Sequence, residues 1–265
     1  MPDAGFPVAM PEGLTAELAD GIALLRMSRP SKRNALNNAM IAGIESFFRH
    51  MPEQAKAAIV CADGDNFSAG LDLSELTGTG VTDALAHSRM WHRAFECVEF
   101  GQVPVISVLH GAVLGGGLEF AAATHIRVAE ESAYFGLPEG QRGIFVGGGG
   151  SVRLPRLIGV ARMMDMMLTG RVLNAQEGLA AGICQYVVPA GHGLERARTL
   201  AAGIASNAPL TNFALMQALP RIAAADRETG LLLESLMAAV AQSDSEAKRR
   251  LRDFLDKRAA RVTPD

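Results

Sequence analysis

Apolar residues occur in short runs along the first 190 residues, and their spacing predicts alternating strands and helices. The runs at 14–18 and 22–27 flank Asp20-Gly21, a dipeptide typical of a tight hairpin turn. Asn37 is a typical helix N-cap, and apolar residues at about helical spacing follow it as far as His50. The start of the chain is therefore predicted to form a β-hairpin followed by an amphipathic helix.

Further short apolar runs predict buried strands that are joined by helices. Helices are expected over residues 118–125 and after the four-glycine turn at 147–150. The predicted strands cover residues 57–61, 103–109, 126–129, 133–135 and 184–188. This alternation predicts an α/β core over residues 1–193.

The pattern changes at about residue 194, where helical stretches begin to dominate. Asn207-Ala208-Pro209 and residues 226–230 separate these stretches. The last predicted helix, over 244–261, carries seven basic residues. We therefore expect residues 194–265 to form a C-terminal helical region.

Composition and charge exclude several classes of protein. Of the 265 residues, 49% are apolar, which argues against a disordered chain. The formal net charge of -3 provides no general attraction to nucleic acid or to a membrane surface, so neither partner is expected. His110, four glycines and Glu119 interrupt the longest apolar region, residues 103–123, which favours a buried strand–turn–helix over a membrane span.

The N-terminus, the cysteines and the histidines suggest a cytoplasmic protein without a metal. Residues 1–20 contain no Lys or Arg, unlike the start of a signal peptide. Cys61, Cys97 and Cys184 are too widely spaced for a disulfide framework or a zinc pattern. The six histidines also lack a metal-ligand spacing. The sequence also lacks a Gly-x-Gly-x-x-Gly fingerprint and a Walker P-loop, so no bound cofactor is expected.

Two glutamates lie in glycine-bearing segments. Glu119 follows Gly115-Gly116-Gly117 at the predicted start of a helix, where glycine lets the backbone approach a ligand and the first N–H groups are free. Glu139 precedes the four-glycine turn. A carboxylate beside amide donors can move protons while the amides stabilise developing negative charge. This combination favours an enzyme that acts next to a carbonyl group.

A series of short motifs runs along nearly the whole chain. They are Ser28-Arg29-Pro30, Asn34-Ala35-Leu36, Phe67-Ser68-Ala69-Gly70-Leu71-Asp72-Leu73, Gly115-Gly116-Gly117-Leu118-Glu119, Phe135-Gly136-Leu137-Pro138-Glu139, Leu168-Thr169-Gly170 and Phe254-Leu255-Asp256-Lys257-Arg258. In this order the sequence resembles the crotonase superfamily, which includes enoyl-CoA hydratases and isomerases. The resemblance implies a spiral of ββα units and C-terminal helices that form a homotrimer or a dimer of trimers. It also implies an acyl-CoA thioester as substrate, with coenzyme A as part of that substrate.

The resemblance also implies roles for particular residues. The thioester oxygen is expected between the backbone N–H groups of Leu71 and Gly116, which form the oxyanion hole. Glu119 would activate a water molecule for attack at Cβ, and Glu139 would deliver a proton to Cα. Isomerases of the family usually keep only the second carboxylate, so the pair favours a hydratase. The residues expected to bind coenzyme A or substrate are Lys32, Arg33, Ala69, Asp72, Leu73, Gly115, Phe254 and Lys257, the last two from a neighbouring subunit.

Departures from the family pattern leave the acyl group open. Val146 replaces a common proline, Gly148 extends the glycine run, and Gly140-Gln141-Arg142 replaces more apolar residues. One alternative is a hydratase–lyase for aromatic enoyl-CoA esters, for which only Tyr134 and Tyr186 could bind a phenol. The others are an enoyl-CoA isomerase and a catalytically silent acyl-CoA-binding protein. Residues 74–91, with Met90 and Trp91, are expected to cover the acyl end.

Overall fold

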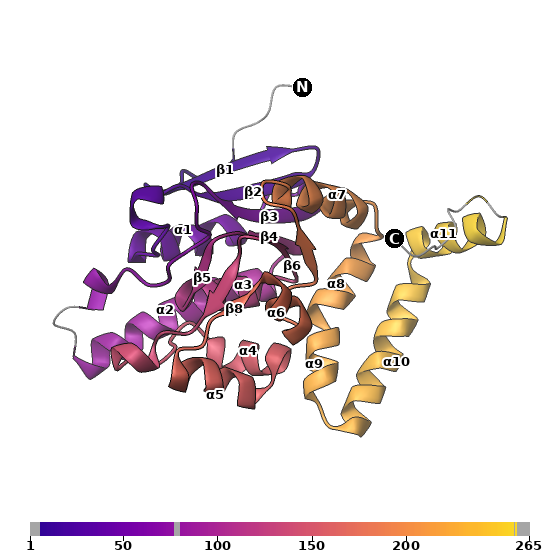
Figure 1. Ribbon diagram of the computed structural model, residues 1–265. Helices are drawn as coiled ribbons and strands as arrows, with labels where there is room; N and C mark the ends of the chain where they lie inside the picture. The colour runs from indigo at the N-terminus through magenta and orange to yellow at the C-terminus, as the bar shows by residue number, and fades with distance from the viewer. Residues whose placement is uncertain (1–5, 77–79, 257, 259–265) are drawn as a thin grey trace. The chain divides into compact units, whose positions relative to one another are not determined.

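The computed structural model describes residues 6–76, 80–256 and 258, and the chain divides into two compact units, Met1–Ala205 and Ser206–Asp265. Figure 1 shows the helices and strands of both units. The strands are β1 (Leu14–Ala19), β2 (Ile22–Met27), β3 (Ala57–Ala62), β4 (Val105–Leu109), β5 (Ala112–Leu114), β6 (Ile126–Glu130), β7 (Tyr134–Gly136), β8 (Leu173–Asn174) and β9 (Tyr186–Val188).

The helices of the first unit are α1 (Asn38–Arg49), α2 (Val81–Glu99), α3 (Gly116–Ala123), α4 (Gly150–Ile158), α5 (Val160–Thr169), α6 (Ala175–Ala181) and α7 (Gly193–Ala205). Three short 3-10 helices are η1 (Pro30–Lys32), η2 (Leu73–Leu76) and η3 (Gly140–Arg142). The second unit contains α8 (Pro209–Gln217), α9 (Leu219–Ala224), α10 (Arg227–Ser243) and α11 (Ser245–Leu255). Among the described residues, no helix combines the length and the apolar character needed to cross a membrane.

The strands of the first unit form two sheets. The larger sheet has the order β1-β2-β3-β4-β6-β9, with β1 antiparallel to β2 and the other pairs parallel. The smaller sheet has the order β5-β7-β8. The predicted hairpin is confirmed, and both Asp20 and Gly21 have the positive φ that a tight hairpin turn requires. The α/β fold class predicted from the sequence is therefore confirmed.

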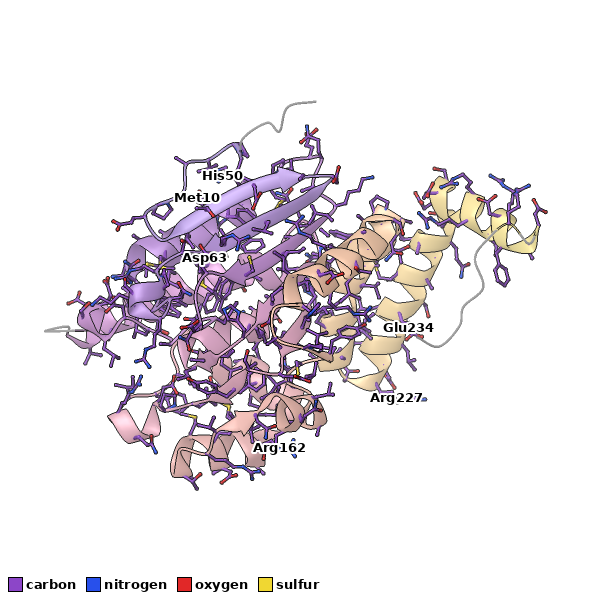
Figure 2. All side chains as sticks on the ribbon, turned by 45° about the horizontal axis from the view of Figure 1, so that its top comes forward. Met10, His50, Asp63, Arg162, Arg227 and Glu234 are labelled. Carbon is purple, nitrogen blue, oxygen red and sulfur yellow. The ribbon has the colours of Figure 1, made fainter. Side chains whose placement is uncertain are left out.

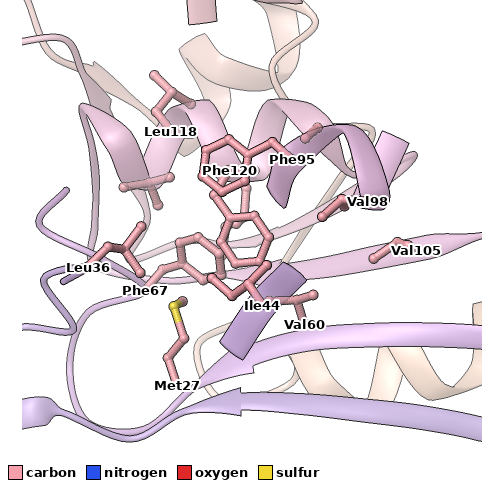
Figure 3. Packing of buried hydrophobic residues seen from close by; sticks show 14 of the residues in the cluster. Met27, Leu36, Ile44, Val60, Phe67, Phe95, Val98, Val105, Leu118 and Phe120 are labelled. Carbon is pink, nitrogen blue, oxygen red and sulfur yellow. The ribbon is translucent and has the colours of Figure 1, made fainter. Parts of the chain in front are cut away.

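The central strands are buried on both faces, which explains their continuous apolar runs. Successive side chains of a strand point to opposite faces. Val60 of β3 belongs to the main core, whereas its neighbour Ile59 packs with Ala197 and Ala201 of α7. In the main core, shown in Figure 3, the rings of Phe95 and Phe120 stack with centroids 5.2 Å apart.

Helix α7 belongs to the first compact unit, which differs from the boundary expected at residue 193. Ala197 and Ala201 are fully buried against the larger sheet. The unit therefore extends to Ala205. The helical pattern of residues 194–205 could not show this difference, because small apolar residues at helical spacing fit a sheet-packing helix as well as a helical bundle.

Helix α2 was not predicted from the sequence pattern. Its buried residues, Trp91, Ala94, Phe95 and Val98, all lie in its second half. The first turns, residues 81–86, are exposed, and their apolar residues Val81 and Leu85 do not belong to the core. By contrast, the predicted helix after Asn37 is confirmed, and the Asn37 side chain accepts a hydrogen bond from the N–H of Met40.

Candidate active site

A pocket of about 380 Å³ opens in the first unit, beside the N-terminus of α3. Its wall combines one face of α2, the start of α3 and the segment that leads into the four-glycine turn. The lining residues are Leu71, Ala84, His87, Ser88, Trp91, Gly116, Glu119, Glu139, Ile144, Phe145, Val146, Gly147 and Gly148.

The backbone N–H groups of Leu71 and Gly116 lie next to each other in this pocket. A Cβ placed on Gly116 would lie 3.3 Å from the nitrogen of Leu71, and one on Gly70 would lie 3.2 Å from the nitrogen of Gly116. In the described part of the chain, neither N–H donates a backbone hydrogen bond. Gly116 is the first residue of α3, where the N–H groups have no partner within the helix.

The segment that carries Leu71 is held by the buried side chain of Asn34. The Asn34 amide donates to the carbonyls of Asp63 (2.8 Å) and Asn66 (2.7 Å). The hydroxyl of Ser68 donates to the Asn34 carbonyl at 2.8 Å. The Asp63 carboxylate, labelled in Figure 2, in turn accepts hydrogen bonds from the side chains of Arg26 and Ser28. The first motifs of the sequence thus help to hold the loop that presents the Leu71 amide.

Glu119 lies in the first turn of α3 and is only 3% exposed. Its Oε1 atom accepts hydrogen bonds from the N–H groups of Gly148 and Gly150, each at 2.8 Å. Burial raises the pKa of Glu119 above its ordinary value, while these N–H groups and the charge of Arg153 act in the opposite direction. The carboxyl group is therefore fixed in position by backbone donors, with Oε2 beside Gly148.

Glu139 has a different environment, immediately before η3. It is 6% exposed, and its Oε2 atom has no hydrogen-bond partner within the described chain. Burial raises the pKa of Glu139 to about 7, and the nearby charge of Glu119 acts in the same direction. A hydrogen bond from its own N–H and the charge of Arg142 oppose this shift. This group can therefore hold a proton near neutral pH.

The side chains of Glu139 and Glu119 lie against Gly115 and Gly150, where any other residue would place a Cβ atom. A Cβ on Gly115, which has a positive φ of 49°, would lie 2.5 Å from Oε1 of Glu139. One on Gly150 would lie 2.7 Å from Cγ of Glu119. These distances are shorter than van der Waals contact, so any larger residue would displace a carboxyl group. The glycine runs noted in the sequence therefore have a steric role at this site.

The residues expected to bind coenzyme A lie in several places. Lys32 and Arg33 are exposed at η1, and the Arg33 carbonyl accepts the N–H of Ala69 at 2.9 Å. Leu73 is 44% exposed. Gly115 is buried beside Glu139.

Asp72 makes its hydrogen bonds within the protein. Its carboxylate accepts from Arg29 at 3.1 Å and from the hydroxyl of Ser74 at 2.8 Å. These bonds lower the pKa of Asp72, the one from Ser74 most strongly. The side chain therefore stabilises its own loop, which limits what it can offer to a ligand.

The two tail residues proposed for coenzyme A lie in the second unit. Phe254 is 64% exposed on α11. Lys257 lies outside the described residues. The expected contact of both residues with a neighbouring subunit remains a prediction.

Helix α2 supplies pocket residues from the segment that was expected to cover the acyl end, residues 74–91. Ala84, His87, Ser88 and Trp91 recur at the spacing of one helix face, and of these four the sequence analysis had singled out Trp91. Met90, the other residue expected there, is not among the lining residues. Spacings of three and four residues could have revealed this face, but its polar members obscured an apolar pattern.

No group of three or more His, Cys, Asp or Glu side chains that could bind a metal ion occurs among the described residues. The pocket brings together two carboxyl groups and two neighbouring amides, with His87 and Ser88 also in its wall. Such a site can transfer protons and stabilise an anionic oxygen.

Comparison with known proteins identifies the family. The model of the enoyl-CoA hydratase/isomerase family matches residues 17–263. This chain belongs to the enoyl-CoA hydratase/isomerase family. The match confirms the family suggested by the sequence motifs.

Individual members of the enoyl-CoA hydratase/isomerase family show how far the similarity extends. A crystal structure of a candidate enoyl-CoA hydratase from Rhodopseudomonas palustris is 56% identical, with a TM-score of 0.91 over 94% of this chain and 97% of that one. A "Probable enoyl-CoA hydratase" of Bacillus subtilis is 33% identical over 89% of this chain and 93% of its own length. The alpha subunit of a fatty acid oxidation complex from Shewanella amazonensis is 38% identical over 72% of this chain, which spans only 28% of that subunit.

Proposed function

We propose that this protein is an enoyl-CoA hydratase, which adds water across the 2,3 double bond of an enoyl-CoA thioester to give a 3-hydroxyacyl-CoA. The observation that carries the proposal is the presence of two buried carboxyl groups, Glu119 and Glu139, in the same pocket as two adjacent backbone amides that donate no backbone hydrogen bond within the described residues. The family membership and the names of the relatives are consistent with this reaction.

In this mechanism the N–H groups of Leu71 and Gly116 bind the thioester oxygen. Addition of a nucleophile at Cβ moves electron density onto that oxygen and produces an enolate-like state. Fixed amide donors stabilise such a state without having to reorganise, and the N-terminal end of the α3 dipole adds to their effect. The two amides therefore lower the barrier to addition.

The two carboxyl groups share the proton transfers. Glu119 accepts a proton from the water molecule as the water oxygen bonds to Cβ, and Glu139 donates its proton to Cα. The backbone donors of Glu119 favour its ionised form, whereas no described residue donates to Oε2 of Glu139, and burial raises the pKa of that group to about 7. One proton shared by the pair is therefore placed preferentially on Glu139.

The remaining expectations extend this proposal. Lys32 and Arg33 are exposed cations available to the phosphates of coenzyme A. We propose that Phe254 and Lys257 of a neighbouring subunit complete that site in a homotrimer or dimer of trimers. The enzyme would act in the cytoplasm and need no metal or bound cofactor, since coenzyme A arrives with the substrate.

The direct test is hydration of crotonyl-CoA by the purified protein, followed by the loss of enoyl-thioester absorbance and by mass spectrometry of the product. We expect a product 18 mass units heavier, as the addition of one water molecule requires. Glu119→Gln and Glu139→Gln are each expected to lower kcat by roughly 10²–10⁴. Full turnover in either variant would rule out the mechanism.

The alternatives give different products in the same assay. Double-bond migration without a gain in mass would identify an isomerase, and acyl-CoA binding without turnover of any enoyl-CoA would identify a silent binding protein. For the aromatic hydratase–lyase, feruloyl-CoA would release an aldehyde. Neither Tyr134 nor Tyr186 lines the pocket, which disfavours phenol binding there.

A further inference from the structure

The glycine loop, residues 147–150, binds Glu119 through its N–H groups, and other side chains bind its carbonyl groups. The Arg153 guanidinium, on α4, donates through Nη1 to the carbonyl oxygen of Gly148 at 3.1 Å. It also donates through Nε to the Glu99 carboxylate, on the last residue of α2, at 2.6 Å. The Arg153 side chain is only 10% exposed, so solvent screens this ion pair weakly.

A second contact from α2 acts on the neighbouring peptide group. The hydroxyl of Ser88 donates to the carbonyl oxygen of Gly147 at 2.7 Å. The N–H of that same peptide group belongs to Gly148 and donates to Oε1 of Glu119. Consecutive peptide groups of the loop are thus each held by a polar side chain, and the first of them binds Glu119 directly.

We propose that Arg153, oriented by Glu99, is a positioning residue for Glu119: it fixes the glycine loop whose amides hold the carboxylate and contributes a nearby positive charge. This inference rests on the role proposed above for Glu119 as the group that activates water. Arg153 does not line the pocket, but it contacts Gly148, which does.

The loop depends on the contacts with Arg153 and Ser88 because its four residues are all glycines. Gly147, Gly148, Gly149 and Gly150 have no side chains of their own to pack, and glycine retains the most backbone freedom of any residue. Gly149 also has a φ of 93°, and a Cβ there would lie 2.4 Å from Nη1 of Arg153. The guanidinium therefore occupies the space that a side chain at residue 149 would take.

Several charged groups near Glu119 and Arg153 could affect the pKa of Glu119. Glu119 faces Glu139 inside the pocket and Arg153 behind the loop. Arg153 also lines a surface pocket of about 260 Å³ together with His92, Glu96, Glu99 and Arg156. Arg156 carries the same charge as Arg153 and lies on the same helix, α4. It makes no hydrogen bond or ion pair with any described residue. Arg156→Met is therefore a matched control for Arg153→Met.

The decisive measurement is the titration of the Glu119 carboxyl carbon by ¹³C NMR in protein labelled at glutamate. The Glu139→Gln background removes the coupled proton, and Glu119→Gln identifies the signal. Loss of the Arg153 charge is expected to shift the Glu119 midpoint to higher pH. Arg156→Met should leave it unchanged, and Arg153→Lys should restore most of the wild-type midpoint.

Turnover provides the second readout. With Glu139 intact, Arg153→Met is expected to lower kcat for crotonyl-CoA hydration by up to roughly 10² through misplacement of Glu119, with little change in KM. Absence of hydration by the wild-type protein would refute the proposed function. Equal Glu119 midpoints in Arg153→Met and Arg156→Met would refute the positioning role, whatever reaction the wild type catalyses.

Discussion

The two carboxyl groups of the pocket, Glu119 and Glu139, are similarly buried but differ in the hydrogen bonds that they accept from the backbone. Glu119 receives hydrogen bonds from Gly148 and Gly150 and has Arg153 behind its loop. Glu139 has an Oε2 atom without a hydrogen-bond partner among the described residues, and its pKa is raised to about 7. Burial raises the pKa of both groups, but several backbone donors and the charge of Arg153 oppose the rise at Glu119. Hydrogen-bond donors rather than burial therefore distinguish the two groups, and the roles proposed for them rest on this difference.

Among variants that keep both carboxyl groups, the largest effect is expected from the loss of an amide donor. Gly116→Pro removes one N–H from the oxyanion hole at a helix position that tolerates proline, and should lower kcat by roughly 10²–10³. Gly116→Ala is its control, because both variants add a Cβ 2.7 Å from Trp91 while only proline removes the donor. Equal kcat values in the two variants would show that the Gly116 amide does not bind the reacting oxygen.

Displacing Glu119 should produce the next largest effect. Gly150→Ala places a Cβ 2.7 Å from Cγ of Glu119 and is expected to lower kcat by roughly 10². Gly147→Ala serves as the control in the same loop, since the nearest atom to its Cβ is Ser88 Oγ at 3.8 Å. The rate of crotonyl-CoA hydration should therefore be much lower in Gly150→Ala than in Gly147→Ala. A similar loss in both variants would indicate a general disturbance of the loop.

The burial of Glu139 should appear in the stability of the protein. The native state retains its proton from the ordinary pKa of 4.5 up to about 7, where the unfolded chain has already lost it. Stability therefore falls as pH rises through this window, by roughly 3 kcal/mol at about 1.4 kcal/mol per pH unit. Glu139→Gln should recover much of this free energy of unfolding at pH 8, as measured by urea denaturation.

A surface carboxyl group tests whether that gain is specific. Glu131 is exposed after β6, so Glu131→Gln should leave the free energy of unfolding at pH 8 nearly unchanged. If Glu139→Gln is no more stable than the wild type at pH 8, the buried carboxyl group ionises without penalty and the contrast with Glu119 fails.

The smallest effect is expected in the pH profile of the wild-type enzyme. Hydration requires one proton on the pair, and the pair loses that proton above the raised pKa of about 7. The value of kcat/KM for crotonyl-CoA should therefore fall by about tenfold per pH unit well above pH 7. A flat profile up to pH 9 would show that Glu139 does not act as the proton donor.

Several features of the site could be read from residue types alone. The glycines at 115–117 and 147–150 marked the places where the backbone approaches a ligand or a side chain, and both glutamates lay beside them. Ordered motifs then identified the family. Helix α2 escaped prediction because its pocket-facing residues include His87 and Ser88, whose polarity breaks the apolar pattern on which helix prediction depends.

The sequence by itself determined the alternation of strands and helices, the family and the two acidic residues, since local spacing and residue chemistry encode these properties. Only the tertiary structure decided that α7 packs on the sheet and that Arg153 contacts the loop holding Glu119. It also brought together the amides of Leu71 and Gly116, which the family resemblance had named. These facts depend on contacts between residues distant along the chain. Hydrogen-bond partners and burial arise from such contacts, and they give two chemically identical carboxyl groups different environments.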